Sequence, residues 1–220
     1  MPFFMSLRAA IRAMTTAVRR DVTKSAIAQS ARHYFDLAGK LLVPAKAIVV
    51  GVGGLSGTGK SALARTIAPM LAPVPGALVF RSDVERKALY GVAENERLPP
   101  AAYHPEISQR IYRIVVDKAA RVARAGHSAI VDAVFANSEE RTALETAAAA
   151  AGVEFRGLFL VADLATRLRR VGMRQPDASD ADIEVAREQE RLVTGAVTWT
   201  RLDAADSPAQ TLVRARAAIT

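Results

Sequence analysis

The eight residues Gly-Leu-Ser-Gly-Thr-Gly-Lys-Ser, positions 54–61, constrain the fold more than any other stretch of this chain. They match the pattern G-x-x-x-x-G-K-[ST], which is the Walker A phosphate-binding loop. An apolar run at 47–53 precedes them and a helix-like pattern at 62–68 follows. This is the strand–loop–helix context that the motif requires. The sequence therefore predicts that the chain binds a nucleotide through this loop.

The residue types of the loop predict how it holds the nucleotide. Its glycines let the backbone curl so that successive N–H groups point at the phosphates, and the following helix adds its positive N-terminal end. Lys60 can reach the β- and γ-phosphates, and the Ser61 hydroxyl can ligate Mg²⁺. The alternative is a glycine-rich turn that precedes a lysine by chance. The expected nucleotide-binding residues are Gly54, Leu55, Ser56, Gly57, Thr58, Gly59, Lys60, Ser61 and Ala62.

The composition fits one α/β domain with an appendage. Of the 220 residues, 50% are hydrophobic and 24% are charged, as is typical of a globular chain. No apolar run approaches the ~20 residues of a membrane span, so no membrane partner is expected. The chain has no cysteine, which excludes disulfides, zinc–thiolate sites and a cysteine nucleophile. This fits a reducing cytoplasm, where we expect the protein.

The net charge of +8 is concentrated at the start of the chain. Residues 1–46 carry eight Lys and Arg against two Asp and Glu, a net of +6, whereas residues 47–220 have a net of only +2. The nucleotide-binding part is therefore nearly neutral, which disfavours a nucleic-acid partner. The basic segment is either a solvated helix surface or a surface for an anionic partner.

Hydrophobic periodicity predicts two helices first and then alternating strands and helices. We place a boundary at 43–46, which divides a basic helical segment, residues 1–45, from an ATP-binding domain, residues 46–220. The expected strands are 47–53, 77–82, 128–132, 153–162 and 196–202. The expected helices after the first are 84–90, 107–126, 138–151, 183–193 and 209–219, with another running from 164 into a loop at 172–182.

Continuous apolar strands that alternate with helices predict a parallel sheet covered on both faces. In such sheets ligands lie at the carboxyl ends of the strands. The phosphate loop, Asp83 and Asp132 each follow a strand at this edge. We therefore expect them to form one site.

Two of these carboxylates have predicted roles in chemistry. Asp132 follows Ala-Ile-Val as a Walker B-like acid would, and it can hold Mg²⁺ directly or through water; the alternative is a strand-end cap. Asp83 and Arg86 are three residues apart, so they share one face of a helix. Asp83 can accept a proton from an acceptor hydroxyl while Arg86 orients substrate or product. The alternative is that Ser82 or Asp83 caps the helix and Arg86 is solvated.

A cluster of arginines precedes and enters the 172–182 loop: Arg167, Arg169, Arg170 and Arg174. Transfer of a γ-phosphoryl group spreads negative charge over three oxygens, which arginines on a closing loop can stabilise. Arg170 and Arg174 are four residues apart, so both can face one site. The alternative is a charged helix face. No N-K-x-D guanine motif follows the fourth strand, which disfavours a GTPase.

Four stretches together resemble the small P-loop kinases, a family that includes polynucleotide, gluconate and chloramphenicol kinases. More closely, they resemble the C-terminal ATP-binding half of bifunctional bacterial proteins whose other half is aminoglycoside-phosphotransferase-like. The resemblance covers most of residues 46–203. The stretches are G-G-L-S-G-T-G-K-S (53–61), R-S-D-V-E-R-K (81–87), A-G-H-S-A-I-V-D-A-V-F-A (125–136) and R-V-G-M-R-Q-P-D-A-S-D-A (170–181).

The resemblance implies an α/β P-loop NTPase fold with a five-stranded parallel sheet of order 2-3-1-4-5, ATP with Mg²⁺, and phosphoryl transfer to a small molecule. Asp83 and Arg86 match the D-x-x-R motif of polynucleotide kinases, in which the acid is the base, and Arg170 and Arg174 match the lid arginines. Residues 1–45 resemble the last helices of a phosphotransferase-like partner domain, whose catalytic part this sequence lacks. Aminoglycoside phosphorylation is therefore not expected of this chain.

The leading hypothesis is an ATP-dependent kinase that acts on a small-molecule acceptor. One alternative is an ATP-binding regulatory module that hydrolyses ATP slowly and signals through its basic helices. The other is a nucleic-acid end kinase, which the D-x-x-R match favours and the near-neutral domain disfavours. The sequence does not identify the acceptor, because the 91–106 segment and the lid determine it by shape.

Overall fold

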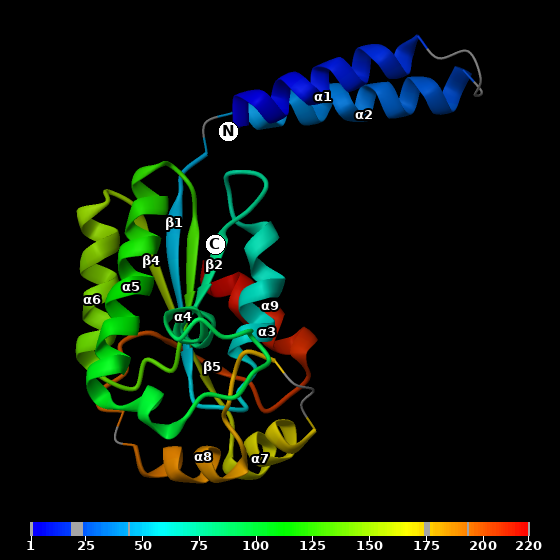
Figure 1. The fold of residues 1–220 in the computed structure, drawn as a ribbon. Coiled ribbons are helices and arrows are strands. Elements are labelled where there is room, and N and C mark those ends of the chain that lie inside the picture. Colours follow the sequence, from blue (N-terminus) through cyan, green and yellow to red (C-terminus); the bar gives the residue numbers. More distant parts are fainter. Residues whose placement is uncertain (1, 19–23, 44, 174–176, 193, 220) are drawn as a thin grey trace. The chain divides into compact units, whose positions relative to one another are not determined.

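The structure is a computed structural model that describes residues 2–18, 24–43, 45–173, 177–192 and 194–219 (Figure 1). The chain forms two compact units, Met1–Ala45 and Lys46–Thr220. The first is a pair of helices, α1 (Pro2–Ala17) and α2 (Lys24–Leu42). The second is an α/β domain that carries the phosphate loop.

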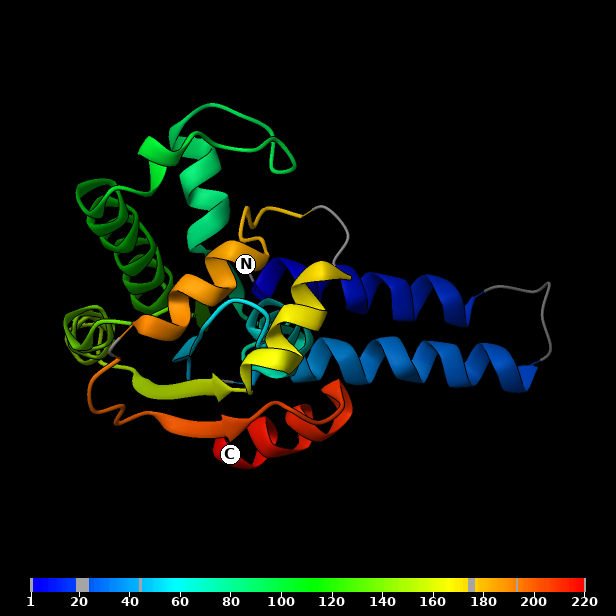
Figure 2. The same cartoon turned by 90° about the horizontal axis from the view of Figure 1, so that it is seen from below.

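The α/β domain is built on a five-stranded parallel sheet in the order β2-β3-β1-β4-β5 (Figure 1). This confirms the fold class, the strand order and the two preceding helices expected from the sequence. Figure 2 looks onto the edge where the strands end. At this edge Arg81 of β2 and Val52 of β1 both pair in register with Asp132 of β3. The strands are β1 (Ile48–Gly54), β2 (Leu78–Arg81), β3 (Ala129–Asp132), β4 (Glu154–Val161) and β5 (Thr200–Asp203).

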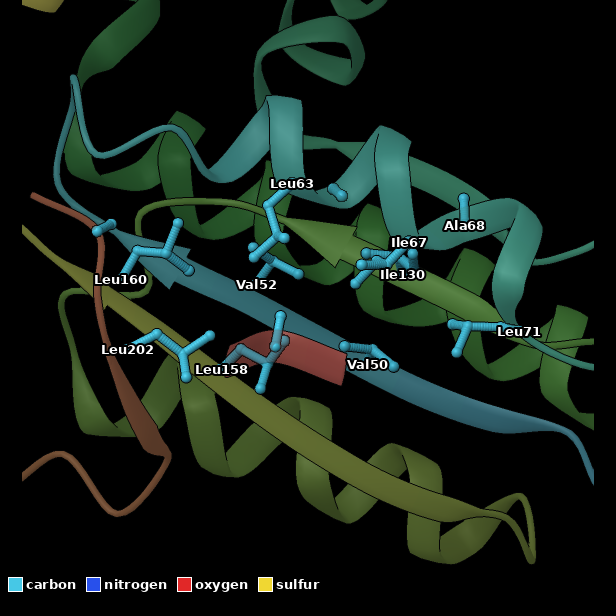
Figure 3. Close-up of a cluster of buried hydrophobic side chains, with 13 residues drawn as sticks. Val50, Val52, Leu63, Ile67, Ala68, Leu71, Ile130, Leu158, Leu160 and Leu202 are labelled. Carbon is cyan, nitrogen blue, oxygen red and sulfur yellow. The ribbon is translucent and has the colours of Figure 1, made fainter. Parts of the chain in front are cut away.

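Helices cover both faces of the sheet, and each face has its own core. On one face, Val50 and Val52 of β1 pack with Leu63 and Ile67 of the helix that follows the phosphate loop (Figure 3). On the other face, Val49 and Val131 pack with side chains of two longer helices. The helices of this domain are α3 (Lys60–Ile67), α4 (Ser82–Leu89), α5 (Pro105–Arg124), α6 (Ser138–Ala150), α7 (Leu164–Gly172), α8 (Ile183–Glu188) and α9 (Pro208–Ile219). Short 3₁₀ turns occur at η1 (Ala68–Met70), η2 (Pro100–Tyr103) and η3 (Gln189–Arg191).

The structure differs from the expected elements in three places. The last strand begins at Thr200 rather than at 196, because the carbonyls of Thr194 and Ala196 accept hydrogen bonds from the buried Arg141 instead of from the sheet. The expected helix at 183–193 ends at Glu188 and tightens into a 3₁₀ turn. The expected cap at Ser82 or Asp83 is not formed: α4 starts at Ser82 directly after β2, so the N-cap position is Arg81, whose side chain makes no capping hydrogen bond.

Trp199 lies against the sheet over two glycines. A Cβ atom on Gly157 of β4 would come within 2.3 Å of the Trp199 Cγ, and one on Gly51 of β1 within 2.4 Å of its ring. The indole N–H donates a 2.6 Å hydrogen bond to Glu145 Oε1 on α6, and the ring packs edge-on against Phe135 with centroids 4.8 Å apart. The two glycines therefore form the space that the buried indole fills.

We expect Gly157→Ala to lower the free energy of unfolding of the α/β domain by about 1–3 kcal/mol, because the added methyl group overpacks a rigid aromatic contact. Urea denaturation followed by Trp199 fluorescence measures the change in midpoint. Gly172→Ala is the matched control, since its Cβ would meet nothing closer than Ile183 Cδ1 at 3.6 Å. A Gly157→Ala midpoint equal to that of the control would contradict this packing.

The α1–α2 unit has a small core of its own. The Ser6 hydroxyl donates a 2.9 Å hydrogen bond to the Ala38 carbonyl across the pair, and only Ala9, Ala38 and Leu41 form the buried cluster among the described residues. Several large apolar side chains of this unit are exposed, among them Phe3, Phe4, Met14 and Phe35. In the described part of the chain, no helix has the length and apolar character needed to cross a membrane.

A protein that starts at Lys46 should fold and bind ATP with an affinity within a few-fold of the full chain. The reason is that neither core cluster of the α/β domain includes a residue from 1–45. Urea unfolding and calorimetric titration with ATP and Mg²⁺ check this expectation. Insoluble or non-cooperatively unfolding protein would show that α1 and α2 are part of the folding unit.

Candidate nucleotide and phosphoryl-transfer site

The phosphate loop connects the end of β1 to the start of α3. Gly57 and Gly59 adopt left-handed conformations, with φ of 86° and 91°. A Cβ atom on Gly57 would lie 2.5 Å from the Arg167 carbonyl oxygen, so the loop approaches another backbone too closely for a side chain. The loop leads into the N-terminus of α3, where backbone N–H groups have no helical partner and can bind an anion.

Two residues far along the chain hold this loop. The Ser56 carbonyl accepts a 3.0 Å hydrogen bond from Arg167 Nε, and the Ser56 N–H donates a 2.7 Å bond to Gln189 Oε1. Arg167 is 1% exposed; its other nitrogens donate to the Ala186 carbonyl at 2.8 Å and to Glu190 at 2.6 Å. Arg167 therefore supports the loop, which the arginine cluster in the sequence did not indicate. No sequence pattern pointed to Gln189.

A phosphate-sized groove of about 150 Å³ lies along the loop. Lys60 makes no hydrogen bond or ion pair with any residue that the structure describes, so its ammonium group is available to a ligand. Arg65, Arg170 and Asp177 contribute charges to the walls of the groove. The full lining is Gly57, Gly59, Lys60, Ser61, Ala62, Arg65, Arg170, Val171 and Asp177.

Asp132 is buried at the end of β3, next to the loop. Its Oδ2 accepts a 3.2 Å hydrogen bond from Arg81 Nε, whereas its buried Oδ1 has no hydrogen-bond partner among the described residues. Burial raises the pKa of the Asp132 carboxyl group, and Lys60, Ser61 and Arg81 offset part of that increase. Arg81 also donates to Ser61 Oγ at 3.4 Å, so one guanidinium contacts both expected metal ligands. A buried carboxylate oxygen without a partner beside a hydroxyl fits an oxygen-preferring cation.

Asp83 lies two residues beyond Arg81, in the first turn of α4. It is partly exposed and makes no hydrogen bond or ion pair with the described residues. Arg81, at the end of β2, contacts Ser61 of the phosphate loop, so the start of α4 that carries Asp83 follows a strand end that contacts that loop. The negative charge of Asp83 adds to the rise in the pKa of Asp132, whose main cause is burial.

Arg86 follows one turn later on α4 and is buried rather than solvated. It donates to the Ala102 carbonyl at 2.6 Å and to Ser108 Oγ at 3.3 Å, and its guanidinium lies 4.8 Å from the centre of the Tyr103 ring. Its Nε has no partner among the described residues. Arg86 therefore anchors the 91–104 segment, here termed the 91–104 loop, next to Asp83.

Of the two expected lid arginines, Arg174 lies outside the described residues. Arg170 donates to three consecutive carbonyls between β5 and α9: Ala204 at 2.6 Å, Ala205 at 3.2 Å and Asp206 at 2.8 Å. Arg170 also lines the phosphate groove and a second cavity beside it. The structure thus places Arg170 between the groove and that cavity.

The second cavity, of about 480 Å³, is the part of the site that the sequence did not indicate. It shares Gly59, Ala62 and Arg170 with the groove, and its remaining walls are mostly apolar. Its walls include Ala204, which follows β5, and Pro208 and Ala209 at the start of α9, and such residues carry no recognisable motif. The lining is Thr58, Gly59, Ala62, Leu63, Thr66, Arg170, Ala204, Pro208, Ala209, Thr211 and Leu212.

The parallel sheet of this order, with a Walker A loop between β1 and α3, defines a P-loop kinase fold. Residues 49–195 match the protein-family model described as "AAA domain", and the chain belongs to this family.

The chain also resembles known proteins in sequence and in fold. The chain is 32% identical over 191 residues to the uncharacterized protein Rv2004c of Mycobacterium tuberculosis; the match covers 84% of this chain and 37% of that protein. The chain thus spans little more than a third of this relative. A gluconokinase from Sinorhizobium meliloti matches with a TM-score of 0.52 and 19% identity, over 79% of this chain and 94% of that one. The Mycobacterium tuberculosis APS kinase CysC matches with a TM-score of 0.53 and 21% identity, over 80% and 97%. These structures show the shared fold.

Proposed function

We propose that this protein is a kinase that transfers the γ-phosphoryl group of ATP to a hydroxyl of a small molecule. The observation that carries the proposal is the Asp83 carboxylate. It lies at the strand-end edge beside the phosphate loop and takes part in no hydrogen bond or ion pair of the described structure. A carboxylate without a structural role at this place is suited to act as a base. The fold shared with a gluconokinase and an APS kinase supports the same reaction class.

Each side chain of the site has a role in this reaction. The phosphate-loop N–H groups and Lys60 bind the phosphates, and Ser61 with Asp132 Oδ1 would hold Mg²⁺. When bound, Mg²⁺ neutralises negative charge on the phosphate oxygens. Asp83 takes the proton from the hydroxyl of the acceptor molecule while the hydroxyl oxygen forms a bond to the γ-phosphorus. The bond between that phosphorus and the β,γ-bridging oxygen breaks, and ADP leaves. Arg174, by its place in the motif, is the proposed arginine for the γ-phosphate.

The mostly apolar cavity next to the groove is the proposed site for the nucleotide base. It joins the groove at Gly59 and Ala62, as a base attached to a bound triphosphate requires. Arg170 lies at the junction, so we assign it to contacts with the nucleotide rather than with the acceptor. Its hydrogen bonds to the 204–206 carbonyls hold the cavity wall in place.

A second candidate function is an ATP-binding module that regulates a partner domain. The proposed partner is a phosphotransferase-like domain, such as the one found in the bifunctional bacterial proteins that the sequence resembles. The observation that favours it is the α1–α2 unit, where a groove lined by Ala13, Met14, Ala31 and Phe35 is open to solvent. The chain also spans only 37% of the length of Rv2004c. A nucleic-acid end kinase is the weaker alternative, since the α/β domain is nearly neutral.

A transfer screen with γ-labelled ATP and Mg²⁺ tests the proposed function. The acceptors are sugars, nucleosides, polyol antibiotics and oligonucleotides with free 5′ ends, each compared with water alone. Label transfer that depends on a small-molecule acceptor supports the kinase. Label on oligonucleotide ends supports the end kinase. Slow release of phosphate that no acceptor changes supports the regulatory module.

A further inference from the structure

The lid loop after α7 touches both the phosphate groove and the 91–104 loop. The lid loop is the 172–182 loop; within residues 177–182, which the structure describes, Asp177 lines the groove and pairs with Arg81 at 3.1 Å. The same Arg81 guanidinium contacts Asp132 at 3.2 Å and Ser61 at 3.4 Å. A ligand in the groove would therefore lie against Asp177 and against Ser61, which contacts Arg81.

Three residues later, the Asp180 carboxylate accepts hydrogen bonds from α4 and from the 91–104 loop. It accepts from Lys87 Nζ of α4 at 2.6 Å, from the Leu98 N–H at 2.9 Å and from the Tyr103 hydroxyl at 2.6 Å. Lys87 is 1% exposed and also donates to the Glu96 carbonyl. The Asp180 carboxylate thus holds the 91–104 loop directly at Leu98 and Tyr103, and through Lys87 at Glu96.

The Asp180 contacts lead directly to the helix that carries the proposed base. The ring of Tyr103, whose hydroxyl binds Asp180, stacks on Arg86, and Arg86 lies one turn after Asp83 on α4. Lys87, the next residue, makes the other side-chain contact to Asp180. The loop that borders Asp83 is therefore held by the lid as well as by Arg86.

We propose that Asp180 is a positioning residue that couples occupation of the phosphate groove to ordering of the 91–104 loop beside Asp83. The proposal rests on the proposed function, because it takes the groove as the ATP site and Asp83 as the base. Residues 177–180 form the connection. Asp177 lines the groove, and Asp180 accepts hydrogen bonds from Leu98, Tyr103 and Lys87. Nucleotide in the groove then stabilises the contacts by which Asp180 holds this loop.

Hydrogen exchange of the full chain, with and without ATP and Mg²⁺, tests this coupling. In the parent protein, we expect ATP to slow exchange in residues 96–104. In Asp180→Asn, this ATP-induced protection should be lost, with exchange in the ATP complex about tenfold faster, as expected for a lost hydrogen bond to a charged group. The affinity for ATP, measured by calorimetry, should stay within about threefold, because Asp180 does not line the groove. A purely structural role would change exchange equally with and without ATP.

Two further variants make the test specific. Asp182→Asn is the matched control: Asp182 is in the same lid segment and pairs with Arg97 of the same loop, but both side chains are exposed, where an ion pair contributes little, and an asparagine can still cap α8. It should keep the ATP-induced protection. Tyr103→Phe removes one hydroxyl from Asp180 and leaves the ring on Arg86, so it should lose part of the protection even if Asp180→Asn folds poorly.

The outcomes separate this inference from the proposed function. One outcome is that ATP binds to Asp180→Asn or Tyr103→Phe and slows hydrogen exchange in residues 96–104 as much as in the parent. In that case the coupling is overturned while the kinase proposal stands. If the parent shows no ATP-induced protection, the coupling is likewise overturned. If ATP does not bind at all, the proposed function fails and the coupling fails with it.

Discussion

Replacing Lys60 by alanine is expected to abolish ATP turnover and to leave the α/β domain folded. Lys60 makes no hydrogen bond or ion pair with the described residues, so its removal breaks no structural contact of that kind, and the buried Asp132 keeps its hydrogen bond from Arg81. Its positive charge is instead available to the β- and γ-phosphates, and it belongs to the loop that binds them. Loss of such a stabilising group reduces turnover by about 10²–10³-fold or more. Calorimetric titration with ATP and Mg²⁺, together with phosphate release, measures the loss.

Lys46→Ala is the control for this experiment. Lys46 is an exposed lysine that precedes β1, and it lines neither the groove nor the larger cavity. It should leave affinity, turnover and the urea midpoint unchanged, while Lys60→Ala leaves only the midpoint unchanged. Unchanged ATP affinity and turnover in Lys60→Ala would remove the phosphate loop from the proposed site.

The sequence predicted the fold well because local patterns determine it. Alternating apolar runs and helical periodicities located all five strands, and the resemblance supplied their order, which the structure confirms. The boundary error at β5 has a non-local cause. Arg141 binds carbonyls of residues 194 and 196 that lie more than fifty positions away. No pattern within a short window contains that contact.

The site was predictable only where a motif is contiguous. Gly54 to Ala62 are recognisable because successive backbone groups form the loop. Gln189 and Arg167 contact Ser56 over 133 and 111 positions, and neither residue type is distinctive at its place. The cavity beside the groove is formed by small apolar residues, which sequence reasoning assigns to a core. Arg86 was expected to be functional or solvated, whereas its partners are the Ala102 carbonyl and Ser108.

Replacing Asp83 by asparagine is expected to slow phosphoryl transfer to the acceptor by at least about 100-fold, within the range of 10²–10⁴-fold that a general base contributes. ATP affinity should remain close to that of the parent, because Asp83 lines neither the groove nor the larger cavity. Helix capping does not complicate the result, because α4 has no side-chain cap. Asp83 also makes no ion pair with the described residues, so the substitution breaks none that could stabilise the fold. Single-turnover transfer from labelled ATP to the acceptor found in the screen measures the chemical step.

Asp117→Asn supplies the matched control for Asp83→Asn, since Asp117 is an exposed acid on α5. Both variants lose one negative charge, so a general electrostatic effect would slow transfer equally in the two. A base at position 83 predicts a loss in Asp83→Asn alone, at unchanged ATP affinity. Transfer by Asp83→Asn within a few-fold of the parent would show that this carboxylate is not the base. The regulatory module would be favoured over the kinase if no acceptor is found and the parent and Asp83→Asn hydrolyse ATP equally slowly. A module without an acceptor offers Asp83 no hydroxyl proton, so the substitution would then have no effect on the rate.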